Sequence, residues 1–220
     1  GMSGMDVKCC RVALAVTLLA LLTGCVTATG PSAAPSALVP VNVEARYGNS
    51  PNEKFDVAAI DPADLRPEYV RQLVDFKGSE SPGTIVVDPR NRFLYLVMEN
   101  GEALRYGVGV GKAGLEFTGK ANVGRKAAWP HWTPTPNMIH REPDRYAKWA
   151  SGMEGGAANP LGARALYLYK DSKDTLFRIH GTNEPKTIGH AVSSGCIRML
   201  NQDVIDLYSR VPIGANVVVR

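Results

Sequence analysis

The sequence predicts a mainly β domain that carries a single clear helix late in the chain. Three observations support this prediction: short runs of β-branched and aromatic residues, turn residues between those runs, and one amphipathic helical pattern near the end. Apolar residues make up 45% of the chain and charged residues 21%, which is typical of a globular protein with its own core.

The first strands are expected between residues 84 and 110. Residues 84–88 form a β-rich run, and residues 92–98 and 103–110 follow it. The last two runs flank Asn100-Gly101, a pair that strongly favours the tight turn of a β-hairpin. We therefore expect an antiparallel pair of strands here.

The second half of the domain shows another strand pair, the helix and a last strand. Residues 165–169 and 175–179 flank a polar turn and predict an antiparallel pair. Asn201 is a suitable helix cap, and Asp203 suits the positive first turn of a helix. Residues 216–219 predict the closing strand. The apolar face of the helix consists of Val204, Leu207, Tyr208 and Val211.

The N-terminal part of the chain has a different composition. Residues 26–55 are rich in Ala, Ser, Pro and Thr, which predicts a flexible tether. We divide the chain into a leader at residues 1–25, a tether with a short helical segment at 26–80, and the folded domain at 81–220. The helical pattern consists of Leu65, Tyr69, Leu73 and Phe76.

The first 25 residues have the features of an export signal. Lys8 and Arg11 flank an apolar stretch at residues 12–22, which is shorter than the ~20 residues needed to span a bilayer. The stretch ends in Leu-Thr-Gly-Cys25, which resembles a bacterial lipobox, where the cysteine receives lipid. A buried helix with a chance cysteine is disfavoured, because small residues and prolines follow at once. We expect a lipid-anchored periplasmic protein, with the outer membrane favoured because Val26 is not Asp.

Charge and residue spacing argue against two classes of function. The net charge is +4, but there is no run of Lys and Arg and no basic stripe with interleaved aromatic residues. Binding of nucleic acid is therefore disfavoured. No pair of histidines or carboxylates shows the spacing of a metal site, so a metal enzyme is disfavoured.

Residues 125–163 form a long irregular segment between the two halves of the predicted sheet. The segment is rich in Pro, Gly, Trp and His and shows no clear period. An irregular insert of this length in a compact domain is usually functional. We therefore expect it to contribute to the functional site.

Cys196 is the candidate nucleophile. If residues 1–25 act as a lipoprotein signal, Cys196 is the one free thiol that remains in an oxidising compartment. It follows Ser193-Ser194-Gly195, a turn of small residues that exposes the sulfur and can direct backbone N–H groups at a developing oxyanion. A lone cysteine is often only buried and inert, so this assignment also needs a base nearby.

Two histidines compete for the role of that base. His180 ends an apolar predicted strand, which holds its side chain rigidly, whereas His190 lies in a loop. The carbonyl of Gly181 can also accept a hydrogen bond from the second ring nitrogen of His180 and fix the tautomer. We favour His180 and keep His190 as the alternative. His131 and His140, in the irregular insert, are expected at the surface or in a substrate groove.

These motifs, taken together, resemble a known family. His180-Gly181-Thr182 is followed, sixteen positions after the histidine, by Cys196 within Ser-Ser-Gly-Cys-Ile-Arg-Met. This set resembles the signature of the L,D-transpeptidase catalytic domain of the YkuD type, which also includes ErfK, YbiS, YcfS and YnhG. Residues 159–163 add to the resemblance, which covers roughly residues 82–220. Many members have His where this chain has Ser194.

The resemblance implies a fold and a reaction. The fold would be a β-sandwich or barrel, with the insert acting as a lid over the donor groove. Cys196 would attack the carbonyl between diaminopimelate and D-Ala in a peptidoglycan stem, release D-Ala and form a thioester. An amine of another stem or of an envelope protein would then take the acyl group. No cofactor is implied, and carbapenems are expected to acylate Cys196.

The resemblance also implies roles for the residues around the motif. The N–H groups of Gly195 and Cys196 would donate to the oxyanion, and the Gly181 carbonyl would orient His180. Arg198 would hold a carboxylate of the stem or support the loop. The other positions assigned to the substrate side are Ser193, Ser194, Thr182 and Trp132, with Trp129 and Tyr146 beside Trp132 on the lid.

Two other functions remain open. Water could resolve the thioester, which would make the protein an L,D-carboxypeptidase or an amidase-like hydrolase on the same scaffold. A wall-binding module without activity is the second alternative, although such a module would not need both His180 and Cys196. A papain-like protease is disfavoured, because its cysteine precedes its histidine in the chain.

Overall fold

The computed structural model describes residues 42–192 and 196–220. The predicted export signal with Cys25 lies outside the described residues. The same holds for Ser193, Ser194 and Gly195 of the predicted oxyanion turn. Cys196, His180 and the insert are described.

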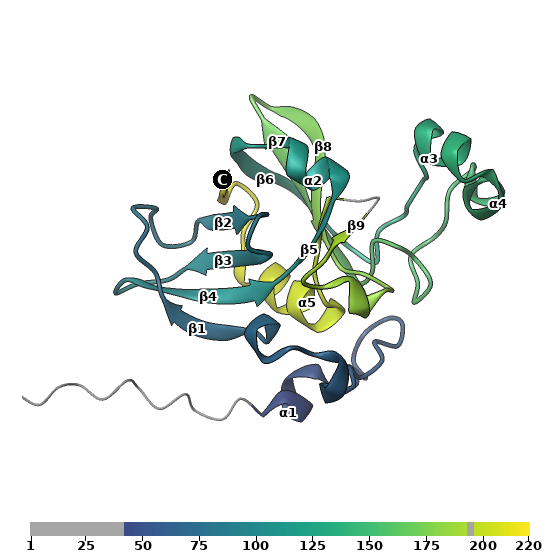
Figure 1. Cartoon of the computed structure of the whole chain (residues 1–220). Helices are drawn as coiled ribbons and strands as arrows, with labels where there is room; N and C mark the ends of the chain where they lie inside the picture. The colour runs from purple at the N-terminus through teal and green to yellow at the C-terminus, as the bar shows by residue number, and fades with distance from the viewer. Residues whose placement is uncertain (1–41, 193–195) are drawn as a thin grey trace, which may run out of the picture. The chain divides into compact units, whose positions relative to one another are not determined.

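Within the described residues, eleven strands form one sheet, in the order β1-β4-β3-β2-β11-β6-β7-β8-β10-β5-β9. Figure 1 shows β1, β4, β3 and β2 side by side at one end of this order. The first half of this order is antiparallel apart from β11 with β2, and β8 pairs in parallel with β10. The strands are β1 Gln72–Asp75, β2 Ile85–Asp88, β3 Phe93–Val97, β4 Glu102–Gly107, β5 Gly109–Gly111, β6 Gly119–Ala128, β7 Arg164–Lys170, β8 Lys173–His180, β9 Ala191–Val192, β10 Ile197–Arg198 and β11 Asn216–Val219.

The helices are short, apart from α5. None of them, in the part of the chain that the structure describes, is long and apolar enough to cross a membrane. The α-helices are α1 Val43–Tyr47, α2 Lys112–Glu116, α3 Pro136–Arg141, α4 Pro143–Tyr146 and α5 Asn201–Arg210. The 3-10 helices are η1 Pro62–Asp64, η2 Pro67–Tyr69, η3 Ala147–Trp149 and η4 Pro185–Thr187.

Both predicted hairpins are confirmed. Asn100 and Gly101 have φ angles of 60° and 73°, which fits the tight turn that joins β3 to β4. Asp171 and Ser172 have φ angles of 50° and 61° and join β7 to β8 in the same manner. These turns fix the strand register, and with it the face on which each side chain lies.

One hydrophobic core lies between the two halves of the sheet, and helix α5 contributes to it. Buried side chains from β2, β3 and β4 meet side chains from β6, β7, β8 and β11 in this core. The predicted helix is confirmed at α5, whose Val204 and Leu207 are buried in the core together with Val211, which directly follows the helix. Asn201 does not cap the helix as expected, because its Oδ1 accepts the N–H of Ala163 at 2.9 Å.

The irregular insert is shorter than the sequence predicts. Residues 125–128 belong to β6, a strand of ten residues that pairs with β11 and β7. The strand was missed because it is rich in Lys, Arg and Gly, and its register shifts between Val123 and Arg125. Gly124 lies at the shift, where a Cβ would overlap the ring of Tyr169. The remainder of the insert carries α3, α4 and η3.

The prediction of a helix from Leu65 to Phe76 was wrong. Pro67 interrupts the pattern, and the segment forms η2 and then β1. Strand β1 pairs antiparallel with β4, which leaves Leu73 52% exposed at the edge of the sheet. The pairing of Gln72–Asp75 with an open strand edge therefore overrides the helical spacing.

Residues 42–55, which the sequence predicts as part of a flexible tether, pack against the domain. Tyr47 is 1% exposed, and its hydroxyl accepts the N–H of Arg71 at 2.7 Å and donates to Asp203 on α5 at 3.2 Å. Glu53 accepts two hydrogen bonds from Arg164 on β7, at 2.6 and 2.8 Å. This segment therefore ties the start of β7 and helix α5 together.

Candidate active site

The thiol and the imidazole lie on one face of two neighbouring strands. In the parallel pairing of β8 with β10, Ile179 is opposite Ile197 and His180 is opposite Arg198. Both isoleucines belong to the core. Because side chains alternate across a strand, His180 and Arg198 point away from the core, and so does Cys196, which directly precedes Ile197.

His180 is buried and its tautomer is defined. Its side chain is 3% exposed, and Nδ1 lies 2.6 Å from the carbonyl oxygen of Gly181. A carbonyl only accepts, so Nδ1–H is the donor and Nε2 carries the lone pair. This is the bond that the sequence predicts. Burial lowers the pKa of His180 to about 4, against the opposing effect of this hydrogen bond.

Gly181 leaves no space for a side chain. A Cβ at this position would overlap Oδ1 of Asn201 and lie close to Gly162. The carbonyl that orients His180 is therefore held between the start of α5 and the loop before β7. A glycine is required here by packing.

Cys196 is also largely buried. The residue is 9% exposed, and Sγ lies 3.8 Å from the carbonyl oxygen of Leu176 on β8. Burial raises the pKa of the thiol, while the backbone N–H and the charge of Arg178 oppose this effect. The sulfur is therefore protonated at neutral pH.

The two groups do not form an ion pair at rest. Among the hydrogen bonds of the described residues, none joins Cys196 to His180. Low pKa at the imidazole and high pKa at the thiol both favour the neutral forms. His180 can accept a proton as the sulfur attacks, but a stable thiolate and imidazolium pair is disfavoured before substrate arrives.

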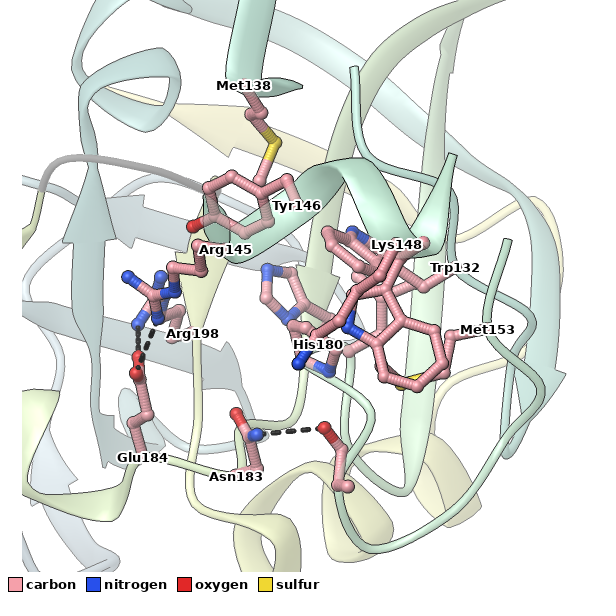
Figure 2. A pocket seen from close by; sticks show the side chains of 14 residues that line it. Trp132, Met138, Arg145, Tyr146, Lys148, Met153, His180, Asn183, Glu184 and Arg198 are labelled. Atoms are coloured by element: carbon pink, nitrogen blue, oxygen red, sulfur yellow. Dashed lines mark hydrogen bonds and ion pairs between the residues drawn. The ribbon is translucent and has the colours of Figure 1, made fainter. Parts of the chain in front are cut away.

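Two cavities open on this face. One, the imidazole-side pocket, has a volume of about 230 Å³ and is lined by His180 and Arg198 (Figure 2). The other, the thiol-side groove, has a volume of about 670 Å³ and is lined by Cys196. Three apolar residues line both cavities and separate them: Trp132, Met138 and Leu161.

A carboxylate bridges the lid and the strand that follows the cysteine. Glu184 accepts from Arg198 of β10 at 2.8 Å and from Arg145 of α4 at 3.0 Å (Figure 2). The side chain of Arg198 is 10% exposed. Arg198 therefore contacts a carboxylate of the protein itself within the imidazole-side pocket, which fits the second of its two expected roles, support of the loop. Binding of a stem carboxylate by Arg198 stays a prediction.

The comparison with known proteins agrees with this geometry. The family model of the L,D-transpeptidase catalytic domain, YkuD, matches residues 82–219, which is more than half of the chain. This chain belongs to the L,D-transpeptidase family. The resemblance inferred from the His-Gly and Ser-Ser-Gly-Cys motifs is confirmed.

Relatives in several organisms are similar over the same region. The probable L,D-transpeptidase ErfK/SrfK of Escherichia coli is 34% identical over 137 residues, which cover 61% of this chain and 43% of that protein. YqjB of Bacillus subtilis, provisionally named for the same activity, is 34% identical over 61% of this chain and 69% of its own length. This chain thus matches less than half the length of the E. coli relative.

A solved structure from Brucella melitensis is also similar. It is described as a probable carnitine operon oxidoreductase, is 54% identical, and has a TM-score of 0.50. The match covers 71% of this chain and 96% of that one. The name of the Brucella protein differs from the transpeptidase names of the relatives in E. coli and B. subtilis.

In this member of the L,D-transpeptidase family, the aromatic residues predicted for the lid separate into two groups. Trp132 and Tyr146 line the imidazole-side pocket, with ring centroids 6.0 Å apart (Figure 2). Trp129 does not line either cavity. Its ring packs edge-on against Phe55, and its Nε1 donates to Glu53 at 3.0 Å. The expectation that Trp129 lines the groove was wrong, because the N-terminal segment covers it.

Thr182 was expected on the substrate side, but the structure buries it. The residue is 3% exposed, and Oγ1 accepts the N–H of Glu184 at 3.0 Å. Thr182 lines neither of the two cavities. Its contact instead holds the turn that presents Glu184 to Arg145 and Arg198.

The other histidines lie apart from His180. His190 lines a third pocket with Arg66 and Tyr69, which is separate from Cys196. His131 lies 3.1 Å from Glu154 and lines the thiol-side groove, as its place in the insert suggested. Among the described residues, no group of three or more His, Cys, Asp or Glu could hold a metal ion.

Several charged residues that line the two cavities were missing from the sequence-based prediction, among them Glu184, Arg145 and Arg178. Arg178 lies two positions before His180 on β8, so the period of a strand places both on the same face. That signal was available in the sequence. Glu184 and Arg145 are thirty-nine positions apart in a loop and in the lid, and no local pattern predicts their contact.

Proposed function

We propose that this chain is a peptidoglycan L,D-transpeptidase that uses Cys196 as its nucleophile and His180 as its base. The observation that supports the proposal best is the placement of His180, at the end of β8, and Cys196, directly before β10, on the face of the sheet that points away from the core. The hydrogen bond from Nδ1 of His180 to Gly181 supports it further, because it leaves Nε2 available as a proton acceptor.

The acylation step follows from these positions. Sγ of Cys196 attacks the carbonyl carbon between diaminopimelate and D-Ala, and Nε2 of His180 takes the thiol proton. The C–N bond then breaks, and the proton passes to the departing amine of D-Ala. A thioester between Cys196 and the stem remains. Formation of the C–S bond as the proton leaves suits two groups that are both neutral at rest.

The transfer step reverses the proton movements. An amine of a second stem, or of an envelope protein, attacks the thioester carbonyl and loses its proton to Nε2 of His180. The C–S bond breaks, and the sulfur is reprotonated. Backbone N–H groups of Gly195 and Cys196 are proposed as oxyanion donors, with Ser193 and Ser194 in the same turn. Trp132 is proposed to contact the stem peptide.

The cellular setting is part of the same proposal. Cys25 would carry the lipid, and residues 26–41 would link the anchor to the domain in the periplasm. Carbapenems are proposed to acylate the same thiol.

The test is incubation with disaccharide-tetrapeptides and mass spectrometry of the products. Cross-linked dimers that have lost D-Ala would support a transpeptidase that uses stems as acceptors. Tripeptides alone would contradict stem cross-linking and favour hydrolysis or a protein acceptor. Absence of any D-Ala release, together with no carbapenem adduct on Cys196, would contradict the proposed mechanism.

A further inference from the structure

A row of four side chains crosses the sheet and ends at the thiol. Arg125 of β6 is opposite Tyr167 of β7, and Tyr167 is opposite Arg178 of β8. The parallel pairing of β8 with β10 then brings Arg178 beside Cys196. Directly opposed residues project from the same face, so all four line the thiol-side groove.

The two arginines are stacked on the tyrosine between them. The guanidinium carbon of Arg125 lies 3.5 Å from the ring centroid of Tyr167, and that of Arg178 lies 4.4 Å from it. Tyr167 is only 5% exposed. Stacking uses the flat face of a guanidinium and leaves the N–H groups at its edge free to bind a planar anion.

The two arginines differ in their charge balance. Asp174 accepts two hydrogen bonds from Arg178, at 2.6 and 2.9 Å, and so neutralises it. Arg125 is exposed, and within the described part of the chain no carboxylate forms a salt bridge with it. Hydrogen bonds from Arg178 and, more weakly, the charge of Arg125 hold the pKa of Asp174 below its ordinary value, against the effect of burial. Because Asp174 is bound by Arg178, Arg125 presents a positive charge that has no carboxylate of the described residues within salt-bridge distance.

The rest of the groove has the same sign of charge. Lys112 and Arg141 also line it, and Glu116 is the acidic residue among the described residues of its lining. With a volume of about 670 Å³, the groove can hold a peptide segment. An anionic peptide would thus be attracted to the cavity that contains the thiol.

Strand spacing limits which group of a substrate can reach Arg125. The guanidinium lies over Tyr167, two strand spacings from Cys196, and two spacings amount to roughly 10 Å. An extended peptide covers this distance with about three residues. The carboxylate that Arg125 binds must therefore lie a few residues from the reacting carbonyl. The carboxylate of the departing D-Ala is too close to that carbonyl to reach Arg125.

We propose that Arg125, stacked on Tyr167 and backed by Arg178, binds a free carboxylate of a stem peptide that lies in the thiol-side groove. The inference rests on the proposed function, because it names the part of the substrate that the groove selects. The carboxylate can belong to the acyl donor or to the acceptor, since both are stems. Arg125 is a specificity-determining residue in either case.

Binding measurements test this site without turnover. In a Cys196→Ala background, calorimetry with a tetrapeptide stem should show about tenfold weaker binding after Arg125→Gln, the size expected for loss of a charged hydrogen bond. Arg125→Lys should recover part of the loss. Arg90→Gln, an exposed arginine on the turn between β2 and β3, is the matched control and should bind like its parent.

Amidated stems provide the second arm. Conversion of the stem carboxylates to amides should weaken binding to the parent protein, and Arg125→Gln should then cause no further loss.

With active protein, slower D-Ala release by Arg125→Gln would assign the carboxylate to the donor, and slower transfer alone would assign it to the acceptor. The inference is overturned if the parent protein binds free and amidated stems equally well and Arg125→Gln also binds the two equally well. Failure of the proposed reaction would appear separately, as absence of D-Ala release by the unmodified protein.

Discussion

The two cavities on the catalytic face differ in size and in how their charges are balanced. On the imidazole side, a pocket of about 230 Å³ contains two arginines that are already bridged by Glu184. On the thiol side, a groove of about 670 Å³ contains Arg125, which forms no salt bridge among the described residues. In the pocket the two arginines already bind a carboxylate of the protein, whereas the groove offers the charge of Arg125 to an anionic peptide.

This difference separates two tasks that one face of the sheet must perform. The imidazole side fixes the base, because His180 is buried and bound to Gly181. The thiol side admits the substrate, because the sulfur opens on the larger cavity. Catalysis needs both a rigidly positioned base and an accessible nucleophile. Because side chains alternate between the two faces of a strand, β8 and β10 place both groups on the same face of the sheet.

The largest effect is expected on removal of the thiol itself. Cys196→Ala should abolish product formation, a loss on the order of 10⁴-fold or more. The melting temperature should change little, because the substitution removes one sulfur beside an open groove. Cross-linking assays and thermal melts measure the two effects. Product formation retained by this variant would show that the thiol-side groove does not contain the nucleophile.

Removal of the base should be nearly as severe. His180→Ala should lower the rate of D-Ala release on the order of 10²- to 10⁴-fold. His190→Ala is the matched control, since His190 lines a separate pocket, and it should remain within about twofold of the unmodified protein. A crippled His190→Ala variant with an active His180→Ala variant would reverse the assignment of the base.

The pH dependence should reveal that both groups are neutral at rest. The pKa of His180 is lowered to about 4, so the imidazole stays unprotonated as the pH falls below the ordinary value of about 6.5. The rate of acylation should therefore hold until the pH approaches that lowered value. Burial raises the pKa of Cys196, so alkylation by iodoacetamide should increase with pH through the alkaline range.

Peptide mass spectrometry can follow this alkylation at Cys196 alone. A plateau of the rate at neutral pH would show that a thiolate is already formed, and would contradict the neutral pair. Loss of acylation near pH 6.5 would contradict the lowered pKa of His180 in the same way.

The smallest effect concerns the bridge between the lid and the strand. Glu184 is 42% exposed, so Glu184→Gln should raise KM for the tetrapeptide donor only about two- to five-fold and change kcat less. Glu142→Gln is the control, because Glu142 contacts Arg145 at 3.5 Å within the lid and forms no salt bridge with Arg198. Steady-state kinetics that show equal effects of both substitutions would mean that the bridge to Arg198 does not matter.

The sequence predicts the parts of the molecule that depend on local signals. Asn100-Gly101 defines a hairpin, and the apolar face of residues 201–210 defines the helix. His180 and Cys196 could be recognised because their neighbours, Gly181 and the small residues before the cysteine, form a short ordered motif. Such signals require only a few adjacent residues.

The parts that were missed depend on contacts between distant residues. Tyr47 looks like part of a polar tether until Arg71 and Asp203 provide its partners. Strand β6 carries few apolar residues and is stabilised mainly by pairing with both neighbours. The contact of Arg145 with Glu184 joins a lid and a loop. None of these can be read from spacing, because the partner lies far away in the chain.

The most direct test of the central claim is the intact mass of the protein after brief exposure to a disaccharide-tetrapeptide. We expect an adduct equal to the stem without D-Ala, mapped to Cys196 after digestion, which disappears when an acceptor amine is added. Cys196→Ala should show no adduct under the same conditions. Release of D-Ala without an adduct on Cys196, or an adduct that persists in Cys196→Ala, would contradict the account.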